Sequence, residues 1–203
     1  MTIDSTKIDN FYNNISEQYD NFANFLDFFF QPKDQFSKDV LEDLNKIAIG
    51  MLTTQERFVQ SYCKPEEQKV LLGKIKEKAT TLSLYANSNE KFAPSVESSE
   101  DLSSDDKFTS IYKGMISNYT AFQRLMGFLH EKIKTGSVAR TNENFLRNLE
   151  VFAGRILNSH REFTGFYGDE GIREILTMEI DAKERALTSD YILPSFSKPF
   201  GER

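Results

Sequence analysis

Apolar residues recur at alternating intervals of four and three along residues 8–29, and this series constrains the fold more than any other feature. Its members are Ile8, Tyr12, Ile15, Tyr19, Phe22, Leu26 and Phe29. These intervals keep side chains on one face of an α-helix, whereas a β-strand requires an interval of two. The series predicts a helix over residues 6–31, with a capping box from Thr6 to Asp9 at its start and Pro32 at its end.

A second series of this kind runs through residues 108–133, and weaker ones mark four further segments. The six predicted helices cover residues 6–31, 34–62, 65–86, 106–135, 142–163 and 170–187, the last along Ile172, Leu176 and Ile180. Seams that repeat every 3.5 residues or so suit helices packed nearly parallel to one another. We therefore expect an all-α fold, a six-helix bundle of antiparallel, heptad-seamed helices.

Residues 87–106 interrupt the helical pattern near the middle of the chain. They are rich in serine and acidic residues, and their apolar residues are isolated. A segment of this composition buries too little apolar surface to fold on its own. We expect a flexible acidic linker here, inside a single helical domain that spans residues 1–203.

The first and fourth predicted helices match at an offset of 100 residues, which places Tyr19 and Phe22 on Tyr119 and Phe122. A duplication of a three-helix unit would produce this match. Two unrelated bundle helices would also share the same rhythm, so the sequence leaves both interpretations open.

The composition indicates a soluble, intracellular protein in a cytoplasmic or stroma-like compartment. Hydrophobic residues make up 39% of the chain and charged residues 28%. No apolar run reaches the roughly 18 residues of a membrane-spanning helix. Cys63 is the single cysteine, which excludes an intramolecular disulfide. The net charge of −6 argues against nucleic acid as the main partner.

Residues for catalysis are scarce, and we expect neither an enzyme nor a bound metal or cofactor. His130 and His160 are the two histidines, and neither follows a glutamate at the spacing of a di-iron bundle. Cys63 has no histidine nearby in sequence to activate its thiol. His160 lies near the end of a predicted helix, where it could bind an anionic group or act as an ordinary terminal cation.

The phenylalanine-rich stretch 22–30 and the basic stretch 147–161 are the candidate interaction surface. Three successive phenylalanines at 28–30 cannot all share one helix face. At least one of them would meet something other than the main seam: the turn between the first two helices, a second layer of helices, another protein, a lipid-like ligand, or a membrane surface as a peripheral contact. The candidate residues are Phe25, Phe28, Phe30, Arg147, Arg155, His160 and Arg161.

Residues 48–67, AIGMLTTQERFVQSYCKPEE, resemble a block of the thylakoid-formation family, helical proteins that assist photosystem II biogenesis and repair. The similar positions are Ala48, Gly50, Thr53, Thr54, Glu56, Arg57, Phe58, Tyr62, Pro65, Glu66 and Glu67. The family's leucine-rich first helix is replaced here by the phenylalanine cluster. The resemblance implies a non-enzymatic helper of membrane-protein turnover, with partners that include a membrane protease.

Taken together, these features predict a non-catalytic helical interaction protein: an assembly factor, an adaptor or a subunit of a larger complex. Its partners would be other proteins, with self-association included, and its role could lie in membrane-protein biogenesis or turnover. The alternative is a carrier that binds a hydrophobic or lipid-like ligand between the phenylalanine-rich helices.

Overall fold

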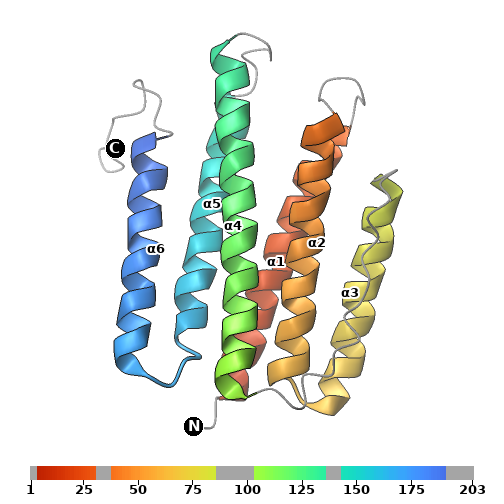
Figure 1. The fold of residues 1–203 in the computed structure, drawn as a ribbon. Coiled ribbons are helices and arrows are strands. Elements are labelled where there is room, and N and C mark those ends of the chain that lie inside the picture. The colour runs from red at the N-terminus through yellow and green to blue at the C-terminus, as the bar shows by residue number, and fades with distance from the viewer. Residues whose placement is uncertain (1–3, 31–37, 86–102, 136–142, 191–203) are drawn as a thin grey trace, which may run out of the picture.

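The computed structural model describes residues 4–30, 38–85, 103–135 and 143–190, which form helices without a β-strand (Figure 1). The helices are α1 (Ser5–Phe30), α2 (Lys38–Tyr62), α3 (Pro65–Tyr85), α4 (Ser104–Lys134), α5 (Glu143–Thr164) and α6 (Glu170–Asp190). The predicted all-α bundle of six helices is confirmed. Residues 34–37 of the second predicted helix and 87–102 of the predicted linker lie outside the described residues, whereas 104–106 already belong to α4.

Polar side chains just before the helices fix where they begin. The Asp4 carboxylate accepts the backbone N–H of Thr6 at 3.1 Å, so Asp4 caps α1 and the predicted capping box from Thr6 is wrong. At α4, Ser103 Oγ accepts the N–H of Asp106 at 3.2 Å and donates to its carboxylate at 2.7 Å. Each cap satisfies an N–H group that the first helical turn leaves without a partner.

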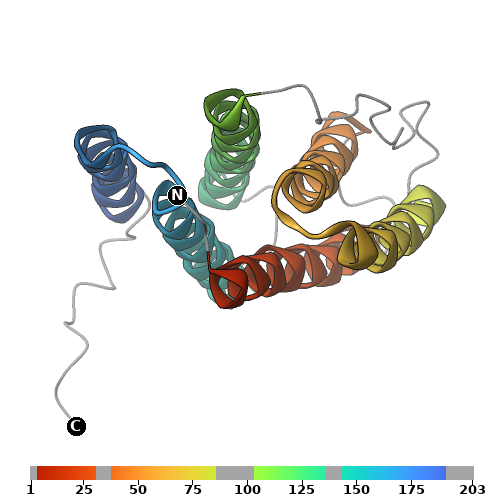
Figure 2. The same ribbon diagram turned by 90° about the horizontal axis from the view of Figure 1, so that it is seen from below.

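Four helices form a ring, and two lie outside it. In the end-on view, α1, α2, α4 and α5 surround the bundle axis, each packed against the next, and α5 closes the ring against α1 (Figure 2). Helix α3 lies outside against α2 and α1, and α6 lies outside against α5. Helices α2 and α5 run opposite to the other four (Figure 1).

Contacts between α1 and α5 show how the ring closes. Near the start of α1, Lys7 Nζ donates to the carbonyl of Gly165, just beyond the end of α5, at 2.6 Å. Further along α1, the ring of Phe22 stacks on that of Phe152 in the first half of α5, with 6.0 Å between centroids. Residues further along α1 thus contact residues earlier in α5, so these two helices are antiparallel.

The two halves of the chain are arranged alike about the bundle axis. Exchanging α1, α2 and α3 with α4, α5 and α6 maps the α1–α2 contact onto α4–α5, α2–α4 onto α5–α1, and α2–α3 onto α5–α6. The chain is therefore a three-helix unit and its pseudo-twofold mate (Figure 2).

Equivalent positions of the halves carry identical residues that are buried in both. Residues that match at an offset of 100 in α1 and α4 are Tyr12 and Tyr112, Tyr19 and Tyr119, and Phe22 and Phe122. Those that match at an offset of 105 in the other two pairs of helices are Leu44 and Leu149, Ala48 and Ala153, Leu52 and Leu157, Phe58 and Phe163, Ile75 and Ile180, and Leu82 and Leu187. A shared helical rhythm explains apolar character but not identity, so the structure favours duplication.

The core is largely aromatic at the end of the bundle where α1 begins. The ring of Phe11 lies 4.7 Å from that of Phe58 and 5.2 Å from that of Phe163, centroid to centroid. Phe108 stacks on Phe163 at 4.8 Å. Tilted and offset rings at these separations attract one another beyond the effect of their burial. Phenylalanines from both halves therefore bind the ring of helices together.

Candidate functional site

The structure does not bring the seven candidate residues onto one surface. Phe25 is half-buried, and its ring meets that of Phe152 edge-on at 5.4 Å, which places it in the packing between α1 and α5. Phe28 and Phe30 belong to α1, but their side chains lie outside the described residues. Arg147 and Arg155 are exposed on α5.

His160 lies inside the bundle and is 1% exposed, so the prediction that it belongs to a surface is wrong. Tyr119 and Tyr112 flank it, with ring centroids 6.0 Å and 6.4 Å away. Burial, reinforced by the nearby charge of Lys183, lowers the pKa of His160 to about 3. The ring is therefore neutral at physiological pH, and it does not act as a cation at the end of the helix.

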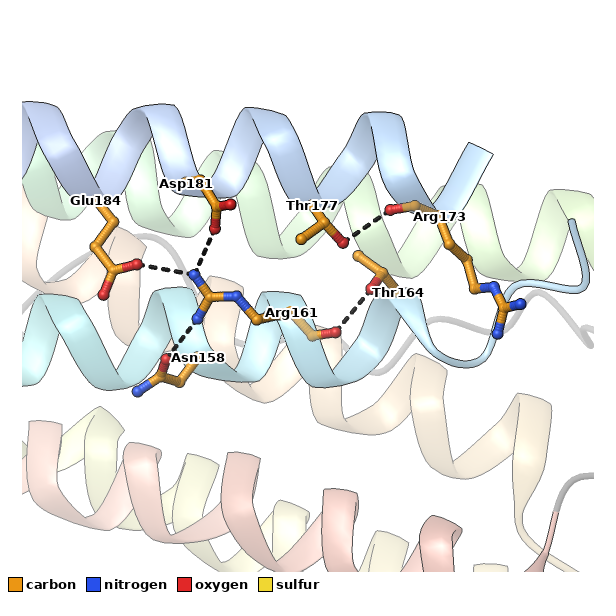
Figure 3. A network of polar contacts seen from close by, with 7 residues as sticks. All are labelled: Asn158, Arg161, Thr164, Arg173, Thr177, Asp181 and Glu184. Carbon is orange, nitrogen blue, oxygen red and sulfur yellow. Dashed lines mark hydrogen bonds and ion pairs between the residues drawn. The ribbon is translucent and has the colours of Figure 1, made fainter. Parts of the chain in front are cut away.

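Arg161 joins α5 to α6 (Figure 3). Its Nη2 lies 2.7 Å from the carboxylate of Asp181 and 2.8 Å from that of Glu184, and Nη1 donates to Asn158 at 2.8 Å. These hydrogen bonds, to Asp181 first and then Glu184, raise the pKa of Arg161. The guanidinium thus makes its hydrogen bonds to groups of the same chain, where it connects two helices.

Two threonines in the same view bond within their own helices. Thr164 donates to the carbonyl of Arg161 at 2.7 Å, and Thr177 donates to that of Arg173 at 2.8 Å (Figure 3). Their hydroxyl groups are thereby satisfied where α5 and α6 lie side by side.

Helix α6 is apolar on two opposite sides. Ile180 and Leu187 are buried against the bundle, as the inward side of an amphipathic helix requires. Ile175 and Met178 are nevertheless 60% and 68% exposed. Ile172 is 39% exposed, so its predicted place in the buried seam is wrong. We call Ile172, Ile175, Met178 and Ala182 the α6 outer face; all are exposed.

Helix α3 is the equivalent of α6 in the first half of the chain, and its residues can be compared with those of the α6 outer face. Val70 is the α3 equivalent of Ile175 at an offset of 105, and the two are exposed to similar extents, 58% and 60%. The equivalents of the other three residues of the α6 outer face are Glu67, Gly73 and Glu77. Helix α3 thus carries glutamate at two of these four positions, whereas α6 carries an apolar residue at all four.

Charged residues border the α6 outer face unevenly. Glu170, Glu174 and Glu179 are exposed along its first part, whereas Arg185 is exposed beyond Ala182. A helix bound antiparallel to α6 would find acidic groups at one end and a basic group at the other.

The described residues offer little for chemistry. Among them, no three histidine, cysteine or acidic side chains lie close enough together to hold a metal ion. Cys63 is buried, and burial, followed by Glu67 and Asp9, raises the pKa of its thiol to about 11. A thiol with so high a pKa is a poor nucleophile.

Among the described residues, two cavities between helices are small. One of about 150 Å³ separates α1 from α3 and is lined by Tyr19, Asp20 and Lys78 among others. Another of about 30 Å³ lies inside the ring. Sites for drug-sized ligands usually measure roughly 300–1,000 Å³, so neither cavity favours the carrier alternative. None of the helices in the described ranges has the length and apolarity needed to cross a bilayer.

The described part of the chain is thus an all-α bundle with pseudo-twofold halves and an apolar outer face on one peripheral helix. Comparisons of the chain with protein-family models, with curated proteins and with solved structures find no match.

Proposed function

We propose that the chain is a non-catalytic helical interaction protein, and that it binds an amphipathic helix of a partner protein along the α6 outer face. The observation that carries this proposal is the contrast between α6 and α3. At the equivalent places, α3 has two glutamates, a glycine and a single apolar residue, Val70, whereas α6 has four apolar residues. A helix with a second apolar side opposite its buried one is suited to contact on both sides, and a partner would cover the outer side.

The energetics fit helix-in-groove recognition. Covering one large apolar side chain contributes roughly 1.5–3 kcal/mol. Ile172, Ile175 and Met178 are spaced by three residues, as are the anchors of helices that bind one another along a stripe. The acidic flank at Glu174 favours basic residues on the partner helix beside it.

The resemblance of residues 48–67 to the thylakoid-formation family supplies the class of partner to test first. On this proposal the chain is an assembly factor or adaptor in membrane-protein biogenesis or turnover. The partner helix would then belong to a membrane protein under assembly, or to a protease that degrades such proteins.

A binding experiment with matched variants tests the proposal. The full chain would be used as bait with three variants: Ile175→Glu, Met178→Glu and the control Val70→Glu. Proteins captured by the wild type would be identified, and a peptide of the bound helix would be titrated against labelled chain. We expect Ile175→Glu and Met178→Glu to weaken the interaction at least tenfold, and Val70→Glu to leave it unchanged.

Three outcomes would contradict the proposal. The wild type could capture nothing, the α6 variants could bind as well as the wild type, or Val70→Glu could weaken binding equally. Sedimentation of the pure protein tests whether a second copy of the chain, instead of a partner protein, occupies the α6 outer face. Self-association that Ile175→Glu abolishes would replace the foreign helix by a second copy of the chain.

A further inference from the structure

Each helix of the ring contributes at least one polar side chain to a layer at the centre of the bundle, and four of them line a cavity there. These residues are Gln18 of α1, Thr54 of α2, Asn118 of α4 and His160 of α5. They line the cavity of about 30 Å³, whose other walls are the apolar side chains of Ile15, Ile47, Met51, Met115 and Ile156. A polar layer in an apolar interior is stable only if its hydrogen-bonding groups have partners.

Two side-chain hydrogen bonds cross the ring and correspond to each other under the pseudo-twofold. Gln18 Nε2 donates to Ser159 Oγ, which joins α1 to α5. Asn118 Nδ2 donates to Thr54 Oγ1 at 3.2 Å, which joins α4 to α2. Gln18 and Asn118 differ in number by 100, and Thr54 and Ser159 by 105, the offsets of the two halves. The same hydrogen bond of the polar layer therefore occurs once in each half of the bundle.

Gln55 and His160 are a second pair of equivalent residues, and each has one polar atom without a hydrogen-bond partner among the described residues. Gln55 Nε2 donates to the carbonyl of Ile15 at 3.0 Å, and His160, its equivalent at an offset of 105, interacts with the backbone of Met115. Gln55 Oε1 and His160 Nδ1 then remain buried, and neither has a hydrogen-bond partner among the described residues. Leaving one such atom unpaired costs roughly 1–3 kcal/mol.

We propose that the cavity binds a water molecule that is hydrogen-bonded to His160 Nδ1 and completes the polar layer. A site needs roughly 10–15 Å³ of such volume to hold one water, and this cavity has about 30 Å³. A buried water also needs two to four polar partners, and Gln18, Thr54 and Asn118 line the same cavity. Because water donates and accepts, it satisfies Nδ1 in either tautomer of the neutral ring. This proposal is independent of partner binding at α6.

The test looks for the water directly in the full-length protein. A crystal structure at high resolution is expected to show solvent density about 2.7–3.2 Å from Nδ1. Deuterium and oxygen-17 relaxation dispersion of the solvent is expected to show a water that exchanges more slowly than the protein tumbles. Both signals should disappear in His160→Leu. They should persist in the control His130→Leu, since His130 does not line this cavity.

His160→Gln protects the test against a variant that fails to fold. It copies Gln55, the residue that the first half carries at the equivalent place, so we expect it to fold and to retain the water. A wild-type cavity without solvent density and without a slowly exchanging water would overturn the proposal. A direct bond from Nδ1 to a protein group would overturn it as well.

Discussion

Gly50 of α2 faces Asn118 of α4 so closely that a methyl group on Gly50 would overlap Oδ1 of the asparagine. The amide of Asn118 cannot turn away freely, because its Nδ2 donates to Thr54 Oγ1 at 3.2 Å. Gly50 therefore lets two helices approach at the level of the polar layer. Its place in the middle of α2, where glycine weakens a helix, has a packing reason.

We predict that Gly50→Ala lowers the free energy of unfolding by about 1–3 kcal/mol, the usual cost of overpacking. Gly73→Ala is the matched control, since a Cβ there meets nothing within 4 Å. That change should raise stability by about 0.5–1 kcal/mol through helix propensity. Urea unfolding of both variants checks the prediction. If Gly50→Ala were as stabilising as Gly73→Ala, the close approach would have no energetic consequence.

His160 should make the protein less stable as the pH falls below 6.5. The folded ring has a pKa of about 3, whereas an unperturbed histidine titrates near 6.5. Between these values the unfolded chain binds a proton that the folded chain does not, so stability falls by up to about 1.4 kcal/mol per pH unit. We expect a loss of about 2 kcal/mol between pH 7 and pH 5.

Urea unfolding at several pH values measures this slope, and variants assign it. His160→Gln should remove most of the dependence between pH 7 and pH 5. His130→Gln should remove less, since burial lowers the pKa of His130 without a second cause. An unchanged slope in His160→Gln would show that other groups control the acid response.

Arg161→Gln should loosen α6 without unfolding the ring. The guanidinium contacts both Asp181 and Glu184, but its side chain is 34% exposed, so solvent screens the charges. We expect a loss of about 0.5–1 kcal/mol that shrinks with added salt. Hydrogen exchange should accelerate in the amides of α6 more than in those of α4.

Arg155→Gln serves as the control for Arg161→Gln, because Arg155 is exposed on the same helix. It should leave hydrogen exchange in α6 unchanged. Equal acceleration in the two variants would mean that general charge, rather than contact with Asp181 and Glu184, holds α6 in place.

Cys63 should react slowly in the folded protein. With a pKa of about 11 instead of 9.0, its thiolate fraction at pH 8 falls about 100-fold. Ellman's reagent should therefore modify the native protein at least about 100 times more slowly than the urea-unfolded chain. Comparable rates in the two states would show that the thiol is accessible and activated.

The positions of the helices could be predicted because their signals are local. The apolar series around Phe22 and Phe122 depend only on neighbouring residues, and their members from Tyr12 to Leu26 and from Phe108 to Leu129 are buried. The error at the start of α1 was small: Asp4 takes the role expected of Thr6, because either side chain suits a cap.

The surroundings of individual side chains could not be predicted in the same way. Nothing local distinguishes a histidine near a helix end from one that faces four packed helices, so His160 was assigned to the surface. Ile172 was placed in the seam because Ile180 fits the same spacing. Ile175 and Met178, the surplus apolar residues of that segment, were the signal that could have revealed a second apolar side.

The ring closes between α1 and α5, the most widely separated helices in sequence among those that pack together. On the ribosome, the stripe of α1 that meets α5 stays uncovered until translation has passed Thr164, the last residue of α5. Until then the aromatic stripe lacks its partner helix, and exposed apolar surface of this kind makes a growing chain prone to aggregation.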